Sequence, residues 1–417
     1  MGMYGMERKA AERRGLRILF KKSRTQEHGA YSNRRVADIV LCIYLICIVG
    51  YLVLTLNVSE LSIRENRKLE TFPTIFNENG INKNFSAAAE KYISDHLSAR
   101  NEMIDGYFTV LSLFDRRGNK QVFIGKDGWL FGNFVGNTHN FEMLSYYQRK
   151  VYFTTAQLKK IKADLKRLND WAAARGIKLY VYFPPDKQTI YKEYYPRFVN
   201  TSDEPTLVTE VEEFLKGEIN VVSLEGAFLK HRHHDLLHYK TESHWSPAGA
   251  YLAYRLIMRR LGRDFPLLKP LGERDIGIGK SADVISAVQL DGYRRVYKGN
   301  LYNMLGKPSY IDTHEPLYKK YTFKNQAQIK TDSVPPFETS FNPNGEALKV
   351  YIIGDSYSDY IMPFLSATFK EVRKVRINQG EGGIRFGSRA SDVENFKPDI
   401  LLLGISDLKM IELLKIW

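Results

Sequence analysis

The chain has 417 residues, which is enough for one large or two ordinary domains. Its composition, 44% apolar, 26% charged and 13% aromatic, is that of a globular protein and excludes a disordered or collagen-like chain. The net charge of +14 is compatible with nucleic acid, an anionic surface or an acidic polymer as a partner, so the location of the charge matters.

Much of the positive charge lies at the start of the chain. Residues 1–35 hold ten Lys or Arg and three Glu, and the run from Ile39 to Leu56 that follows has no charged residue. This run is long enough to span a bilayer core and longer than the apolar core of a signal peptide. We therefore predict a cytoplasmic basic arm over residues 1–35 and a membrane helix over residues 36–57, with the remainder of the chain extracytoplasmic.

This arrangement argues against nucleic acid as the partner. The basic arm directly precedes the predicted membrane helix, where positive charge sets the orientation of the helix in the membrane. The rest of the chain contains no recognised nucleic-acid motif. We expect a single-pass protein of the cell membrane, with the lipid bilayer as a partner and no nucleic acid.

The two cysteines, Cys42 and Cys47, both fall inside the predicted membrane helix. The part beyond the membrane therefore has no thiol nucleophile, disulfide or thiolate metal site. A polar stretch over residues 58–84 predicts a linker, and residues 85–417 form the predicted extracytoplasmic domain.

The elements of this domain follow from its hydrophobic patterns. Residues 85–114 show helical spacing, and "KQVFIGKDGWLFG" predicts a strand, a turn at residues 126–128 and a second strand. From residue 155 onward helices alternate with strands: helices near 155–176, 204–216 and 246–261, and strands at "IKLYVYF" and "INVVSL". We expect an irregular stretch from 262 to about 345, and then the strands "ALKVYIIG", "EVRKVRI" and "DILLLGI". The alternation predicts an α/β fold with a parallel sheet and flanking helices.

The segment "YIIGDSYSDY", residues 351–360, places a serine at the end of an apolar strand. Ligands bind at the carboxyl ends of strands in open α/β sheets, where helix N-termini also point. Ser356 is therefore a candidate nucleophile, and the backbone N–H of Ser356 or Tyr357 is a candidate oxyanion donor. The alternative is a polar loop in which Asp355 or Ser358 caps the helix.

A candidate base lies upstream in "LLHYKTESHWSPAGAY", residues 236–251. Glu242 and His244 are two positions apart, so an extended segment would point both side chains to one side. The carboxylate would then orient the imidazole, whose other nitrogen would accept the proton of a serine. Trp245 beside them would form an apolar wall that excludes water.

Histidines gather close to this pair, so a metal site is an alternative. His231, His233, His234, His238 and His244 lie within fourteen residues. They lack a helical i, i+4 pair of ligands unless one helix runs from His234 to His238. The other interpretation of the stretch up to His238 is an exposed basic segment.

At this point the sequence resembles the AlgX- and AlgJ-like alginate O-acetyltransferase family and the related DHHW proteins, which have SGNH-hydrolase-like domains. "YKTESHWS" resembles their Asp-x-His-Trp motif, and "GDSYS" their serine motif, in the family's order along the chain. "ENRKLETFP", "YISDHLSAR", "IGKDGWLFG", "PPDKQTIY" and "YKGNLYNMLG" are similar to further family segments. The likeness runs from about residue 59 to residue 405.

The resemblance implies that Ser356 is the nucleophile, His244 the base and Glu242 the orienting acid. Glu242 departs from the family's Asp, and Asn300 stands where the family has Asp in its Gly-Asp-Leu motif. Arg385 lies where the family often has an arginine after the next strand, so it is a candidate to hold a sugar or the oxyanion; the alternative is a surface charge in a glycine-rich loop.

The function that the resemblance implies is O-acetylation of a cell-surface or secreted polysaccharide through an acyl-serine. It also implies a membrane-bound O-acyltransferase (MBOAT) that supplies acetyl groups, and neither a cofactor nor a metal. Two alternatives remain open. One is a carbohydrate acetylesterase with the same triad, and the other is a non-catalytic glycan-binding or assembly protein, which the Glu242 departure motivates.

Overall fold

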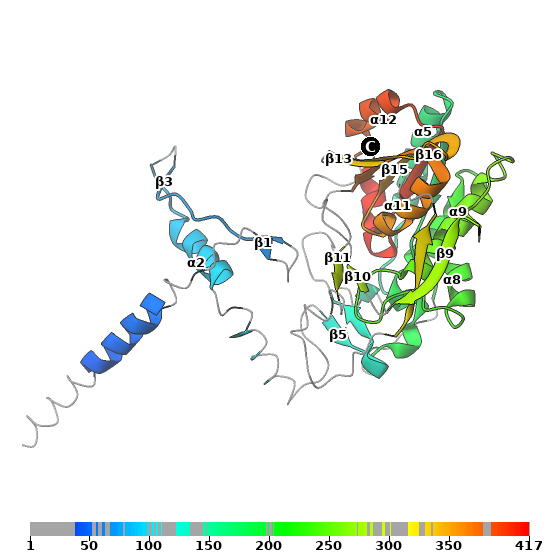
Figure 1. The fold of residues 1–417 in the computed structure, drawn as a ribbon. Coiled ribbons are helices and arrows are strands. Elements are labelled where there is room, and N and C mark those ends of the chain that lie inside the picture. Colours follow the sequence, from blue (N-terminus) through cyan, green and yellow to red (C-terminus); the bar gives the residue numbers. More distant parts are fainter. Residues whose placement is uncertain are drawn as a thin grey trace, which may run out of the picture. The chain divides into compact units, whose positions relative to one another are not determined.

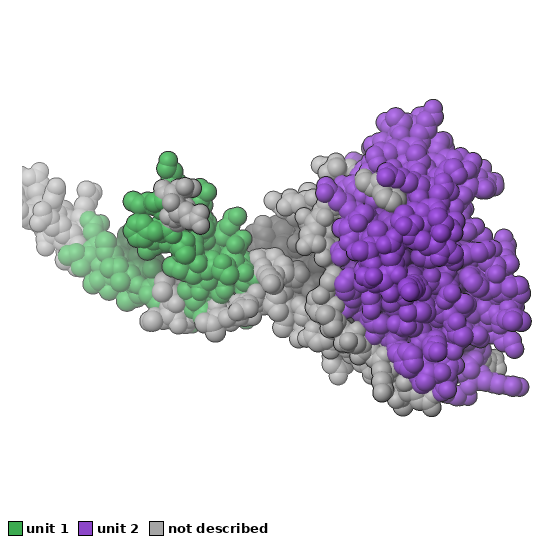
Figure 2. All heavy atoms as spheres, turned by 90° about the horizontal axis from the view of Figure 1, so that it is seen from above, with its two compact units in different colours: residues 1–104 green, residues 105–417 purple. Residues whose placement is uncertain are grey.

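The computed structural model describes residues 38–51, 67–77, 80–97, 122–133, 148–196, 204–272, 316–324, 337–377 and 385–416, with shorter pieces between them. The chain divides into two compact units, residues 1–104 and 105–417 (Figure 2). The predicted boundaries after residues 35, 57 and 84 all fall within the first unit and stay predictions.

In the first unit, residues 38–51 form a helix with exposed side chains, which begins at Asp38 and continues into the uncharged run that was expected to cross the membrane. Among the residues that the structure describes, no helix is both long and apolar enough to span a bilayer. The predicted membrane helix, which extends into residues outside the described ranges, therefore stays a prediction. The unit also holds helix α2 (Phe85–His96) and the two-stranded pairs β1 (Leu61–Ser62) with β2 (Arg67–Lys68) and β3 (Phe76–Asn77) with β4 (Gly80–Ile81).

The second unit begins, in its described part, with a hairpin. Strands β5 (Val122–Ile124) and β6 (Leu130–Gly132) pair antiparallel around the single turn η1 (Lys126–Gly128). Asp127 and Gly128 both have positive φ, which lets the chain reverse within three residues. The strand, turn and strand expected here are confirmed.

A seven-stranded sheet forms the centre of this unit (Figure 1). The strand order is β13 (Lys330–Val334), β14 (Phe337–Phe341), β16 (Phe369–Arg376), β15 (Glu346–Gly354), β17 (Ile400–Gly404), β7 (Lys178–Tyr182) and β8 (Val221–Val222). The five strands from β16 to β8 run parallel, whereas β13 and β14 run antiparallel to their neighbours. The expected parallel sheet is therefore confirmed for these five strands and wrong for β13 and β14, so the sheet is mixed.

Helices cover the sheet in two groups. Helices α9 (Pro247–Leu261) and α11 (Tyr357–Thr368) pack against each other, and α11 lies on β15 and β16. Helix α5 (Thr155–Ala173) lies on β7 and packs with α7 (Leu207–Leu215) and η5 (Asp407–Lys415). The central strand β17 is buried at every residue, which requires cover on both faces of the sheet.

The stretch from 262 to 345 also differs from expectation. Strands β9 (Ile276–Ser281) and β12 (Tyr318–Phe323) pair antiparallel and pack near α9, and β10 (Val284–Ser286) pairs with β11 (Arg294–Val296). The expected irregular segment is therefore wrong for these residues and for β13 and β14. Strands β9, β12 and β14 are partly exposed, and β13 has the polar sequence "KTDSV", so these strands lack the apolar run that marks a buried strand.

Candidate active site

Ser356 lies at the carboxyl end of the central strand β15, where α11 begins. The strand is buried from Val350 to Gly354, and Ser356 is the first residue before the helix. A side chain at Gly354 would collide with the side chain of Ser358, so the close approach of strand and helix requires glycine here. The turn therefore presents Ser356, which is partly exposed, at the edge of the sheet.

Asp355 holds this turn in place from inside. Its carboxylate accepts hydrogen bonds from the backbone N–H of Tyr357 at 3.0 Å and from that of Ser406 at 2.7 Å. The turn after β15 is thus tied to the loop after β17. Because the Tyr357 N–H is engaged, it is not free to bind an oxyanion. The backbone N–H of Ser356 donates no hydrogen bond to another of the described residues.

The structure brings the three residues of the expected triad together. His244 Nε2 lies 2.7 Å from Ser356 Oγ, and His244 Nδ1 lies 2.9 Å from Glu242 Oε1. An Nδ1–H that donates to the carboxylate leaves Nε2 unprotonated, so Nε2 can accept from the serine hydroxyl. Glu242 is fully buried, and the side chain of His244 is 12% exposed.

The segment that carries the pair is not extended, as the sequence had suggested. Residues 240–244 form a series of bends between His238 and Trp245, which form an antiparallel bridge. The expected extended geometry is therefore wrong, although Glu242 and His244 still meet. At this bend the side-chain nitrogen of Lys187 donates to the backbone carbonyls of residues 239, 240 and 242.

Aromatic rings surround the imidazole of His244. The ring of Tyr360 stacks on it at a centroid distance of 5.3 Å, and the ring of Tyr357 lies 5.0 Å away. Trp245 is completely buried behind them, with its ring edge-on to Tyr357. Its side chain offers no surface to a substrate, so it backs the site and does not line it. Tyr360 was not singled out from the sequence, since a tyrosine in an apolar helix reads as core.

A buried carboxyl group lies behind Tyr357. The Tyr357 hydroxyl lies 2.7 Å from Asp186 Oδ1 and 3.1 Å from the carbonyl oxygen of Ser243. Burial raises the pKa of Asp186 to about 7. The Tyr357 hydroxyl carries one hydrogen, which it donates to Asp186 or to the Ser243 carbonyl, so this tyrosine links the turn at Asp186 to the backbone beside His244.

Two of the expected site residues are not joined to this group. Arg385 is exposed just before η4 (Phe386–Ser388). Its carbonyl accepts a hydrogen bond from Ser388, and within the described residues it makes no hydrogen bond to Glu242, His244 or Ser356. Asn300 lies outside the described residues. Its described neighbour Leu301 is buried, and its N–H donates to the carbonyl of Thr241 at 3.1 Å. The roles expected for Arg385 and Asn300 stay predictions.

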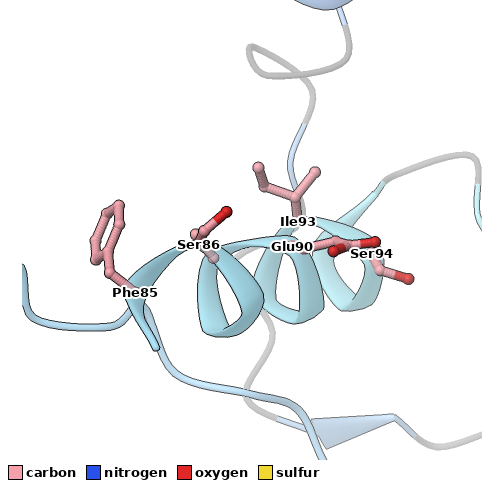
Figure 3. A pocket seen from close by; sticks show the side chains of 6 residues that line it. Phe85, Ser86, Glu90, Ile93 and Ser94 are labelled. Carbon is pink, nitrogen blue, oxygen red and sulfur yellow. The ribbon is translucent and has the colours of Figure 1, made fainter. Parts of the chain in front are cut away.

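The histidines do not form a metal centre in the described residues, where no group of three His, Cys, Asp or Glu side chains is placed to bind an ion. His238 is buried with Nε2 at 3.0 Å from the carbonyl of Pro185, and burial lowers its pKa to about 3. A hollow in the first unit is lined by Phe85, Ser86, Ala89, Glu90, Ile93 and Ser94 of α2 (Figure 3). It contains a single titratable group and no nucleophile–base pair, so it is not a candidate active site.

The mixed sheet carries Ser356 at the carboxyl end of its central strand, β15. This is the arrangement of an SGNH-hydrolase-like α/β domain. Residues 122–383 match the family described as ALGX, the SGNH hydrolase-like domain of acetyltransferase AlgX. The match covers more than half of the chain, and the chain belongs to this family, which is a family of acetyltransferases.

Solved structures of proteins from Bacillus and Pseudomonas species have a similar fold. PatB1 of Bacillus cereus is 14% identical over 69% of this chain and 95% of its own, with a TM-score of 0.47. The O-acetyltransferase domain of Pseudomonas putida AlgJ is 17% identical over 70% and 92%, with a TM-score of 0.46. Pseudomonas aeruginosa AlgX is 13% identical over 68% and 61%, with a TM-score of 0.42. A comparison with curated proteins finds no match.

Proposed function

We propose that this protein transfers acetyl groups to hydroxyls of a cell-surface or secreted polysaccharide through an acyl-serine intermediate. The observation that carries the proposal is the continuous hydrogen-bonded row from Glu242 through His244 to Ser356, at the carboxyl edge of the sheet. A serine hydroxyl needs such a base to become a nucleophile near neutral pH. Membership of an acetyltransferase family supports the choice of the acyl group.

The first half of the reaction forms the acyl-enzyme. Ser356 Oγ attacks the carbonyl carbon of the acetyl donor while His244 Nε2 takes the hydroxyl proton. The negative charge on the carbonyl oxygen is stabilised by the N–H of Ser356 at the N-terminus of α11, where the helix dipole is positive. The donor's leaving group departs with the proton from His244 and leaves acetyl-Ser356.

The second half returns the serine to its starting state. A sugar hydroxyl attacks the acetyl carbon, and His244 Nε2 accepts its proton. The bond from the acetyl carbon to Ser356 Oγ breaks, and His244 protonates the serine oxygen. Glu242 accepts the Nδ1–H in both halves and stabilises the positive imidazolium. Water in place of the sugar would give hydrolysis, so transfer depends on the acceptor displacing water.

We also propose that the domain is anchored in the cell membrane and faces away from the cytoplasm. The basic arm of residues 1–35 followed by an uncharged run supports this topology. The described helix within that run exposes apolar side chains such as Ile39, Ile43 and Ile46. In this arrangement a membrane-bound O-acyltransferase delivers the acetyl group to Ser356 at the outer face of the bilayer.

The test is acetyl transfer by the purified full-length chain and its Ser356→Ala variant. We expect the wild-type chain to release the alcohol from an aryl acetate and to place acetyl groups on added polysaccharide, and the variant to do neither. Ser223→Ala is the matched control, because Ser223 is an exposed serine whose hydroxyl donates to the carboxylate of Glu212, which is not among the expected site residues. In cells the variant should lack polymer acetylation.

The same measurements separate the alternatives. Acetate release that is unchanged by added glycan, without transfer, would identify a carbohydrate acetylesterase with the same triad. Polymer acetylation that persists in cells carrying Ser356→Ala would show that the protein binds or assembles glycan without catalysing the reaction.

A further inference from the structure

Lys187 is the first residue of the short helix α6 (Lys187–Ile190). Its side chain is completely buried. Nζ donates to the backbone carbonyl oxygens of Tyr239 at 3.1 Å, Lys240 at 3.1 Å and Glu242 at 2.8 Å. The aromatic faces of Trp129 and Phe131 from the β5–β6 hairpin lie 5.9 Å and 5.4 Å from the same nitrogen.

This arrangement matches the chemistry of an ammonium group. A lysine ammonium has three N–H donors, and three carbonyl oxygens accept them here. Burial of an unpaired charge is strongly unfavourable, so the carbonyls and the aromatic faces offset the loss of water. Hydrogen bonds with a charged donor are also stronger than neutral ones. The segment 239–242 is thereby held in its bent form around one fixed cation.

The bend has a direct consequence for the acid and base. The third acceptor is the carbonyl of Glu242 itself, the residue whose side chain orients His244. Two further contacts link the same turn to this segment. The carbonyl oxygen of Pro185 is hydrogen-bonded to the ring of His238, and the Tyr357 hydroxyl lies within hydrogen-bond distance of both Asp186 and the carbonyl of Ser243. Lys187 therefore holds the backbone from which the Glu242 side chain extends.

We propose that Lys187 is a positioning residue for the reaction, which holds the backbone of residues 239–242 so that Glu242 and His244 keep their alignment with Ser356. This inference rests on the proposed function of Ser356 and His244. Lys187 itself is enclosed and does not contact the reacting atoms. Its effect is expected in the rate of the chemical step and not in substrate affinity, since small displacements of a catalytic group are costly in rate.

The experiment compares Lys187→Met with wild type in the full-length chain. Methionine keeps an unbranched apolar stem against Trp129 and Phe131 but removes all three donors. We expect kcat for an aryl acetate to fall about 100-fold, with KM within about threefold. Lys126→Met is the matched control, because Lys126 also donates to a backbone carbonyl, that of Glu193 at 2.8 Å, but at an exposed position outside the site.

A second control separates positioning from general stability. Leu165→Ala in the buried core of α5 should lower the melting temperature without touching the 239–242 segment, and its kcat per folded molecule should stay within about threefold of wild type. A folded Lys187→Met variant with wild-type kcat, or a loss of kcat matched by Leu165→Ala, would overturn the proposal.

Lys187→Gln serves as the second variant if the methionine variant does not fold, because its amide keeps two donors on a shorter stem. If neither variant folds, Lys187 serves the fold alone and the proposal is overturned as well. An active Ser356→Ala variant would refute the proposed function, whereas an inactive Ser356→Ala with an active Lys187→Met would refute only the positioning role.

Discussion

At the scale of single residues, the site depends on how a buried carboxylate meets one imidazole. Glu242 Oε1 accepts from His244 Nδ1 and also from the backbone N–H and hydroxyl of Ser243, at 3.1 Å and 3.2 Å. The glutamate side chain makes these contacts from a backbone that is bent and not extended.

The first prediction tests this carboxylate. Glu242→Gln should lower kcat by about 10³–10⁴-fold, because the amide no longer stabilises the imidazolium. Glu242→Asp should lose less, about 10-fold, since it keeps the charge but withdraws it by one methylene from a fixed bend. Steady-state kinetics with an aryl acetate measure both variants. Activity of Glu242→Gln close to wild type would contradict the proposed role of the acid.

The second prediction concerns Asp407, which is fully buried and accepts from the Thr189 hydroxyl at 3.0 Å. Burial raises its pKa to about 7 from an ordinary value of 3.8. Between these two values the unfolded chain releases a proton that the folded chain retains. The free energy of unfolding therefore falls as the pH rises through this window, and the stabilising contribution is complete only below it.

Asp407→Asn removes this dependence because the amide does not ionise. Relative to wild type, we expect the variant to gain about 1–3 kcal/mol in free energy of unfolding between pH 5 and pH 8. Melting temperatures of both chains at the two pH values measure the gain. An equal difference between wild type and variant at both pH values would show that Asp407 is already ionised at pH 5.

At the scale of elements, the site is the meeting of three turns. The turn from β15 to α11 presents Ser356, the bend before α9 presents Glu242 and His244, and the turn from β7 to α6 supports that bend from below through Lys187. Ser246 begins α9 by accepting the N–H of Gly249, which fixes the chain directly after the pair. Each turn is short, and hydrogen bonds join the three to one another.

The third prediction tests the close approach of strand β15 to helix α11, where Gly354 meets Ser358. Gly354→Ala places a methyl group against the side chain of Ser358 and should push α11 and Ser356 away from His244. We expect a loss of about 1–3 kcal/mol in free energy of unfolding and a clear fall in kcat. Gly387→Ala is the matched control, since a methyl group there meets nothing within 4 Å. Thermal unfolding and kinetics on both variants decide; equal behaviour would refute the steric argument.

At the scale of the whole molecule, the two compact units carry different features. The described residues of the second unit carry the sheet and the hydrogen-bonded row of Glu242, His244 and Ser356. The first unit holds the basic arm, the uncharged run and the α2 segment. The proposed membrane anchor would confine the proposed catalytic domain near its acetyl donor and its polymer, which would raise the effective concentration of both.

The fourth prediction tests the anchor. Deletion of residues 39–56 should move the chain from the membrane fraction to the soluble fraction, because this run supplies the apolar surface for insertion. Deletion of residues 1–35 is the control: the chain should stay in the membrane while its orientation is disturbed. Fractionation and protease accessibility report the two effects. A full-length chain that is soluble without detergent would contradict the anchoring proposal.

Sequence reasoning selected Ser356, His244 and Glu242, which the structure brings together, because each lies in a short pattern with strong local meaning. An apolar strand that ends in Gly-Asp-Ser predicts a serine at a sheet edge, and an acid two residues before a histidine predicts an oriented base. It missed Lys187 and Asp186, which lie 55 or more residues before Glu242 and which a linear reading treats as an ordinary polar turn. A "PPDK" segment directly after a buried strand was the available signal.

The sequence by itself determined the alternation of helices and strands, the hairpin at residues 122–132 and the three residues of the site, because hydrophobic period and turn chemistry are local properties. The tertiary structure alone decided the antiparallel edge of the sheet, the bend of residues 240–244 and the burial of Lys187 beneath it. These features arise from hydrogen bonds between segments far apart in the chain, and no local pattern records which distant carbonyl a buried ammonium will meet.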